Sequence, residues 1–181
     1  MDTSRLQDNV SELLTLVGEN PQREGLLETP TRVASFYKEV LSGYKQDPLT
    51  HATTFPSEGH NMVIVRDINF YSLCEHHLVP FFGTVSIGYI PNEKILGLSK
   101  FARIVEVFAR RLQVQERLTN EILKTILTIL EPFGCAIKVE AKHLCMSMRG
   151  IKKEEATTVT TAFTGSLEKN EMLRKEFLSS L

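Results

Sequence analysis

The sequence predicts an α+β protein in which an antiparallel four-stranded sheet carries helices on one face. Helical apolar stripes and β-rich segments follow one another as two helices, two strands, two helices, two strands and a final helix. Of the 181 residues, 42% are hydrophobic and 24% are charged, which supplies enough apolar surface for a folded core. We expect residues 1–61 to form an N-terminal helical extension and loop. Residues 62–181 would then form the α+β domain that carries the chemistry, and the two together one structural unit.

The N-terminal region predicts two helices and a loop. Apolar residues from Leu6 to Val17 recur at helical spacing, and Gly18 is a suitable C-terminal stop. Thr29 and Pro30 are expected as the N-cap and first residue of a second helix. Residues 44–61 contain Gly, Pro, His and Thr without periodicity, which indicates a connecting loop.

The remaining segments predict two strand pairs that flank two helices. MVIVRDINFYSL and GTVSIGYI are β-rich and indicate a long hairpin around CEHHLVPF. GLSKFARIVEVFARRL predicts a helix capped by Ser99, and ERLTNEILKTILTIL a helix that ends before Pro132. CAIKVEAKHLCM and TTVTTAFTGS predict two more strands, and NEMLRKEFLSSL a terminal helix. Because exposed sheet edges favour association, we expect neighbouring subunits to cover them.

Charge and hydropathy exclude several classes of protein. With 21 basic and 22 acidic residues the net charge is −1, which disfavours a general binder of nucleic acid or membrane surfaces but allows a local pocket for a small anion. No apolar run reaches the roughly 20 residues that cross a bilayer. The first residues also lack the order of a signal peptide. These features predict a cytoplasmic protein.

The cysteines suggest a metal site. Three cysteines favour metal ligands or buried thiols over a disulfide framework. Cys74 and His77 are separated by two residues, and His143 and Cys145 share one face of their predicted strand, an arrangement that suits zinc. In the alternative interpretation Cys145 is a small core residue and the other two are unrelated loop residues. Cys135 begins the strand without a histidine neighbour and is expected in the core.

The number of ligands distinguishes a structural from a catalytic zinc site, because catalytic sites use three protein ligands and leave a position for water. The candidate ligands are Cys74, His77 and Cys145. This choice leaves His76 and His143 beside the metal as proton carriers. His51 and His60 are expected on the solvated surface.

A second group of residues suggests an anion pocket. Lys100 and Arg103 follow Ser99 in the first turn of a helix, where cations are unfavourable unless an anion binds. The alternative is a solvated pair on an exposed turn. Glu116 opens the next helix, where it either complements the helix dipole or accepts an N–H pair from a base. Two further candidates for phosphate contacts are Arg32 and Arg149.

The chain resembles the GTP cyclohydrolase I family in four stretches: REGLLETPTRV, the CEHH run at Cys74–His77, GLSKFARIVEVFARRLQVQERLT, and HLCMSMRG at His143–Gly150. The resemblance covers most of the chain and implies the tunnelling fold, in which monomer sheets join into a barrel. It further implies a homodecamer with active sites at subunit interfaces. It implies zinc ligands at Cys74, His77 and Cys145, catalytic residues at His76, His143 and Ser99, a guanine-binding Glu116, and triphosphate contacts from Arg32, Ser99, Lys100, Arg103 and Arg149.

The resemblance implies a zinc-dependent conversion of GTP and water to 7,8-dihydroneopterin triphosphate and formate, the first step of folate or pterin biosynthesis. In that reaction His143 protonates nitrogen 7 of the purine. His76 then carries a proton as the ribose opens, and Ser99 assists an Amadori-type rearrangement. The alternative is a purine-nucleotide-binding module with structural zinc and no turnover, which needs His143 as a fourth ligand. A nitrile-reducing relative of the same fold would leave Cys145 and the phosphate cluster unexplained.

Overall fold

The computed structural model describes residues 1–181, which form two compact units, Met1–Ser42 and Gly43–Leu181. The first unit pairs helix α1 (Thr3–Leu16) with helix α2 (Thr29–Val40), and the single turn η1 (Glu24–Leu26) lies between them in sequence. Both predicted helices are therefore confirmed.

The end of α1 is as predicted, and the start of α2 differs from the prediction by one residue. The Asp2 carboxylate caps α1 by accepting a hydrogen bond of 3.1 Å from the Arg5 amide. Gly18 follows the end of α1 with φ of 89°, a left-handed conformation that glycine adopts without strain and that stops the helix as predicted. The expected cap of α2 is wrong by one residue, because Glu28 occupies the N-cap position and Thr29 is already helical.

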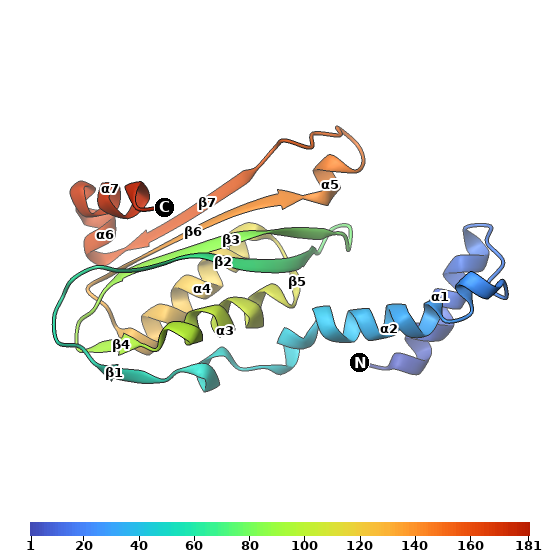
Figure 1. The fold of residues 1–181 in the computed structure, drawn as a ribbon, viewed down its shortest axis with the longest axis horizontal. Coiled ribbons are helices and arrows are strands. Elements are labelled where there is room, and N and C mark those ends of the chain that lie inside the picture. The colour runs from blue at the N-terminus through green and yellow to red at the C-terminus, as the bar shows by residue number, and fades with distance from the viewer. The chain divides into compact units, whose positions relative to one another are not determined.

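A curled five-stranded sheet forms the centre of the second unit (Figure 1). All neighbours are antiparallel except the two-residue strand β5, which pairs parallel to β2 and was not predicted. The four predicted strands are confirmed. In spatial order the strands are β5 (Leu112–Gln113), β2 (Val63–Cys74), β3 (Pro80–Ile90), β6 (Gly134–His143) and β7 (Thr158–Thr164).

Helices cover both faces of this sheet, so the prediction of helices on one face is wrong. The long helices α3 (Leu98–Ala109) and α4 (Gln115–Leu130) lie against one face (Figure 1). On the opposite face, Phe177 packs so closely on Gly88 that a Cβ there would lie 2.5 Å from its ring. The terminal helix that the sequence predicts is confirmed, and it covers this second face. The helices of the C-terminal segment are α6 (Gly165–Lys169) and α7 (Glu171–Ser179).

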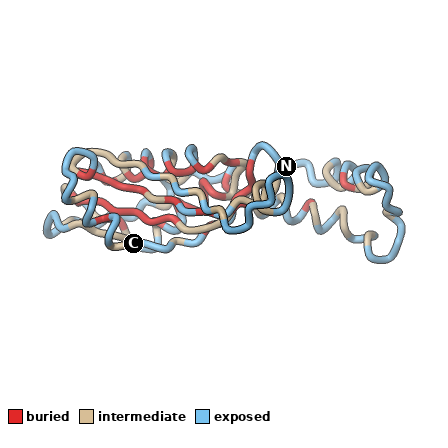
Figure 2. The backbone as a smooth tube through the Cα atoms, turned by 90° about the horizontal axis from the view of Figure 1, so that it is seen from above, coloured by how far each residue is buried: buried red, intermediate tan, exposed pale blue.

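Two apolar cores result from this arrangement. The larger core fills the space between α3, α4 and the sheet, and its fully buried members include Phe81, Phe101 and Ile122. The smaller core joins Leu167 and Phe177 to the other face of the sheet. Figure 2 shows buried residues along the strands of the second unit. Packing on both faces therefore fixes the strands whose ends carry the candidate site.

The predicted loop over residues 44–61 is partly structured. It contains the short 3₁₀ turns η2 (Ser42–Lys45) and η3 (Pro48–His51). Strand β1 (Thr54–Pro56) follows and pairs antiparallel with β4 (Lys94–Leu96), which forms a separate two-stranded sheet. The missing periodicity of this segment misled the prediction, because a three-residue strand is too short to show one.

A β-bulge interrupts β2 at Arg66 and Asp67. The register with β3 shifts between Val65 and Ile68, and Asp67 has a φ of 60°. As a result, odd-numbered Val65 and even-numbered Ile68 both contribute to the larger core. The extra residue thus changes which alternate side chains face α3 and α4.

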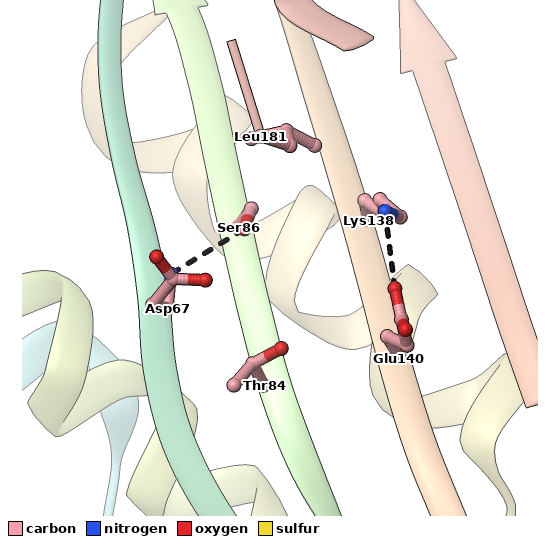
Figure 3. A pocket seen from close by; sticks show the side chains of 6 residues that line it. All are labelled: Asp67, Thr84, Ser86, Lys138, Glu140 and Leu181. Carbon is pink, nitrogen blue, oxygen red and sulfur yellow. Dashed lines mark hydrogen bonds and ion pairs between the residues drawn. The ribbon is translucent and has the colours of Figure 1, made fainter. Parts of the chain in front are cut away.

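On the sheet face away from α3 and α4 lies a hollow of about 260 Å³ (Figure 3). Two of the charged residues that line it, Lys138 and Glu140, form an ion pair of 3.1 Å, and a third, Asp67, pairs with Arg66. The Ser86 hydroxyl accepts a 3.4 Å hydrogen bond from the Asp67 amide at the bulge. No helix of the structure has the length and apolarity required to span a bilayer.

Candidate active site

The candidate site lies where β2 and β6 end and β3 begins. A tight turn over residues 75–79 joins β2 to β3, closed by hydrogen bonds from the Cys74 amide to the Val79 carbonyl at 2.9 Å and from the Leu78 amide to the Cys74 carbonyl at 2.8 Å. Leu78 adopts a left-handed φ of 55°. The Phe81–His143 register pair brings the end of β6 to the same end of the sheet. Residues distant in sequence therefore meet at this turn.

Three side chains form a group that could hold a metal ion: Cys74, His77 and Cys145 have one donor atom each, all within 4.8 Å of one another. Cys74 is buried, whereas His77 is exposed and Cys145 is half-buried. The Cys74 sulfur lies 4.0 Å from Nδ1 of His77. We call these three residues the metal group. They are the three that ligand counting selected.

Cys145 reaches the metal group by a route that the sequence did not predict. Strand β6 ends at His143, and Cys145 lies in the short helix α5 (Leu144–Ser147). The expectation that His143 and Cys145 share a strand face is therefore wrong. Cys145 is still close to Cys74 and His77, as predicted, but the helical turn of α5 places it there and not the alternation of a strand.

The three thiols have different environments. Cys135 is fully buried in the larger core, as predicted, and burial raises its pKa to about 12. Burial and the neighbouring Cys74 also raise the pKa of Cys145, because both disfavour the thiolate. A cation bound by the metal group would reverse this balance by stabilising the thiolate.

The other histidine of the turn, His76, lies beside the metal group. Its Nδ1 is 3.8 Å from the Cys74 sulfur, and its Nε2 is 3.9 Å from the Glu75 carboxylate. Glu75 also pairs with Arg117 of α4, and its amide donates a 3.0 Å hydrogen bond to the Gln113 carbonyl. These contacts fasten the histidine turn to the start of α4.

His143 occupies a more enclosed position. Its ring stacks on the buried ring of Phe81 with a centroid separation of 4.7 Å and an interplanar angle of 3°. Burial lowers the pKa of His143, and the negative charge of Glu116 partly opposes this shift. His143 does not belong to the metal group; its Nε2 lies 2.8 Å from Oε1 of Gln115.

Gln115 is the residue near the site that the sequence analysis missed. It is 2% exposed, and its amide nitrogen bonds to two strands of the sheet. Nothing in the sequence distinguishes it from the exposed polar residues that begin many helices. Its burial becomes visible only when the two strands and α4 are packed together.

Glu116 and Arg149 approach the same end of the sheet. Glu116 lines a hollow of about 190 Å³ together with Thr119, Asn120 and Thr160. The charge of Arg149 acts on the thiol of Cys145 and favours its ionised form. Both residues are exposed, so each can meet a ligand from outside.

The predicted anion group lies at the opposite end of α3 from the metal group. Ser99, Lys100 and Arg103 occupy the first turns of α3, whereas the C-terminal end of that helix leads into β5 beside Cys74. Ser99 does not cap the helix as expected, because Gly97 holds the N-cap position and makes no side-chain hydrogen bond. Neither Lys100 nor Arg103 forms an ion pair within the chain.

The remaining candidates lie elsewhere. Arg32 belongs to α2 in the first unit. His60 is exposed as expected, with Nδ1 at 2.9 Å from the Pro91 carbonyl oxygen. His51 is half-buried and lines a hollow of about 270 Å³ that includes Arg103.

Comparison with known proteins shows the family of this chain. The sequence model described as GTP cyclohydrolase I matches residues 6–181. The chain belongs to the GTP cyclohydrolase I family. Proteins named GTP cyclohydrolase 1 from Campylobacter lari and Porphyromonas gingivalis are each 51% identical to it over 97% of this chain, and over 93% and 92% of their own lengths. The protein of that name from Streptococcus gordonii is 51% identical over 99% of this chain and 97% of its own length.

Membership of the GTP cyclohydrolase I family confirms the resemblance found in the sequence and the predicted enzyme class. A crystal structure of the archaeosine synthase QueF-Like in the apo form overlaps with 57% of this chain at 18% identity and a TM-score of 0.46, a level that supports no functional conclusion.

Proposed function

We propose that this chain converts GTP and water to 7,8-dihydroneopterin triphosphate and formate, with zinc as its metal. The observation that carries the proposal is the metal group of Cys74, His77 and Cys145 in a chain of the GTP cyclohydrolase I family. His76, in contact with Cys74, and His143, two residues before Cys145, supply two groups that can exchange protons.

The donor set of the metal group fits zinc. Thiolate and imidazole are preferred zinc ligands, and three of them leave a position for water, as in catalytic sites. Two donors of one tetrahedral zinc lie roughly 3.5 Å apart. The separation of 4.0 Å between Cys74 Sγ and His77 Nδ1 is close to that value. Zinc bound by these residues would supply an activated water for hydrolysis of the purine ring.

His143 and His76 would act as the proton donor and proton carrier of the reaction. His143 would give a proton to nitrogen 7 of the purine, which makes carbon 8 more electrophilic. Burial lowers the pKa of His143, which makes the protonated ring a stronger acid toward the purine and also reduces the fraction of rings that carry the proton. His76 would carry a proton as the ribose ring opens, and Ser99 would assist the rearrangement that follows.

The substrate would be held at both ends. The Glu116 carboxylate would accept two N–H groups from the guanine edge, and its hollow leaves room beside it. Arginine and lysine are suited to a triphosphate by charge and by the geometry of their donors. The cationic residues proposed for this role are Arg32, Lys100, Arg103 and Arg149, with the Ser99 hydroxyl beside them.

We further propose that several copies of the chain assemble into a decamer of tunnelling-fold barrels with active sites at their interfaces. Strand β7 ends the sheet with one side unpaired, which supports edge-to-edge joining of copies. The anion group and the metal group lie at opposite ends of α3, which supports a site that combines the two groups from different copies.

Formate release from GTP tests this function. The purified protein would be assayed as a metal-loaded sample, after chelation, and after zinc is added back. We expect release that stops on chelation and returns with zinc. A folded, zinc-loaded oligomer that releases no formate would overturn the proposal and favour a purine-nucleotide-binding module.

A further inference from the structure

The side chain of Gln115 connects His143 to the backbone of two strands. Its Nε2 donates to the carbonyl oxygens of Val139 at 3.1 Å and Thr158 at 3.0 Å. It also lies 3.2 Å from Oγ1 of Thr160. The opposite end of the same amide, Oε1, lies 2.8 Å from Nε2 of His143.

These contacts fix which way the amide points. A carbonyl oxygen accepts hydrogen bonds and cannot donate one, so the nitrogen of the Gln115 amide must face Val139 and Thr158. The amide oxygen therefore faces His143. Because an amide oxygen also only accepts, Nε2 of His143 must carry the hydrogen in this bond.

The ring of His143 has little freedom to escape this bond. It is parallel to the buried ring of Phe81 at a centroid separation of 4.7 Å, and the two residues are register partners in β3 and β6. The other ring nitrogen, Nδ1, makes no hydrogen bond within the chain. The two nitrogens of His143 therefore differ: the protein holds Nε2, and Nδ1 remains available.

We propose that Gln115 is a positioning residue that keeps a hydrogen on Nε2 of His143 and thereby assigns proton exchange with the substrate to Nδ1. This inference rests on the proposed function for the identity of the substrate. In the step, the Nδ1–H bond of the protonated ring breaks as the N7–H bond of the purine forms. The electron pair of the broken bond stays on Nδ1, and the positive charge passes to the purine. Gln115 keeps its hydrogen bond to Nε2 throughout.

Measurement of the neutral tautomer of His143 tests whether Nε2 carries the hydrogen. The zinc-loaded full chain, labelled with ¹⁵N-histidine, would be studied by solid-state NMR, which separates the two neutral tautomers by their nitrogen shifts. The His143 signals are those missing from a His143→Asn sample. We expect hydrogen on Nε2 in the wild type and a mixture of tautomers in Gln115→Met, which matches glutamine in length but has no amide.

Kinetics supply the second readout. A general acid contributes about 10²- to 10⁴-fold to a rate, so partial loss of its alignment in Gln115→Met should lower kcat by about 10- to 100-fold. KM for GTP should change less than about twofold, because no substrate contact is removed. Zinc content should stay the same. Gln115→Glu keeps an acceptor toward Nε2 but has no donor for the Val139 and Thr158 carbonyls. It should therefore retain the Nε2–H form and more of kcat than Gln115→Met, with a lower free energy of unfolding than the wild type.

Thr128→Ala is the matched control, since Thr128 is an exposed residue near the far end of α4. It should leave the tautomer, kcat and zinc content unchanged. Hydrogen on Nδ1 in the wild type would overturn the assignment even if Gln115→Met fails to fold, as would an unchanged tautomer in that variant. A wild type that has the Nε2–H form but releases no formate would overturn the proposed function and leave the positioning of His143 by Gln115 in place.

Discussion

The metal group lies beyond the C-terminal end of α3, and the anion group lies at its N-terminal end. At the metal end, the backbone of one chain brings three donor atoms within 4.8 Å of one another. At the anion end, Ser99 and Arg103 are exposed, and neither Lys100 nor Arg103 has an ion-pair partner. The fold of one chain thus brings the metal donors together, whereas the cations of the anion group have no ion-pair partner within the chain.

This difference has a physical origin. The metal donors follow strand ends that pack on the larger core through Cys74 and Phe81, so their convergence results from the packing of the sheet. Lys100 occupies the first turn of α3, where the helix dipole opposes positive charge, and Arg103 follows in the second turn. Folding therefore stabilises the first arrangement and works against the second, and mutations at the two ends should have separable effects.

The largest effect is expected from Cys145→Ser at the metal end. Removal of one of three ligands should abolish stoichiometric zinc binding and lower kcat/KM by at least about 10³-fold, since hydrolysis depends on the bound ion. Metal analysis and formate release measure both quantities. Cys135→Ser is the control, because the Cys135 sulfur lies in the core and outside the metal group. Unchanged zinc content in Cys145→Ser would exclude Cys145 as a ligand.

A smaller effect is expected from Arg103→Ala at the anion end. Loss of one charge-assisted phosphate contact costs about 1.5–3 kcal/mol, which corresponds to an increase in KM of about 10- to 150-fold. The zinc content should not change. Lys124→Ala, which removes an exposed cation from α4, should leave KM as it is. A loss of zinc in Arg103→Ala would contradict the view that substitutions at the anion end leave the metal group unaffected.

The third prediction concerns Cys135, a buried thiol at the start of β6, at the end of that strand opposite to the metal group. Its folded pKa of about 12 lies above the ordinary value, so the stability from the neutral buried thiol is complete below about pH 9. That stability should fall by roughly 1.4 kcal/mol per pH unit as the pH rises from about 9 toward 12. The stability of Cys135→Ala has no such dependence on a thiol. The substitution leaves a small cavity, which lowers the free energy of unfolding by about 1 kcal/mol at pH 7.

Chemical denaturation of the wild type and of Cys135→Ala from pH 7 to 10.5 tests whether the stability of the wild type falls relative to the variant as the pH rises. The difference in unfolding free energy should favour the wild type at pH 7 and reverse above about pH 9.5. A difference that stays constant over this range would show that Cys135 ionises equally in the folded and unfolded chains.

The smallest effect is expected from Ser99→Ala. Because Gly97 holds the N-cap position of α3, loss of the Ser99 hydroxyl should change the free energy of unfolding by less than about 0.5 kcal/mol. A capping serine would cost about 1 kcal/mol. Thermal unfolding without nucleotide separates these values. Any loss of turnover in this variant would then reflect substrate chemistry and not helix stability.

The sequence was sufficient for the main strands and helices, because each has a clear period or a clear stop such as Gly18. It was insufficient where a local choice depends on tertiary packing. His143 and Cys145 were expected to alternate on one strand, but the chain turns into α5 after His143. The side of the sheet that α7 covers depends on the space above Gly88, which no local pattern shows.

The candidate site was predictable to a similar extent. Spacing and ligand number selected the three members of the metal group, since Cys and His at short intervals are uncommon outside metal sites. Gln115 was not predictable, because its role depends on two carbonyl groups and a histidine that lie 24 to 43 residues away in the sequence. Polar contacts of this range leave no periodic signal.

The bulge at Arg66 and Asp67 constrains how the length of this chain can change during evolution. It shifts the alternation of β2 so that Cys74 faces the same core as Val65. An insertion or deletion of one residue between the bulge and Cys74 would turn the thiol to the opposite face of the sheet and remove it from the metal group. Changes of two residues would preserve its orientation. This segment should therefore vary in amino-acid identity much more readily than in length.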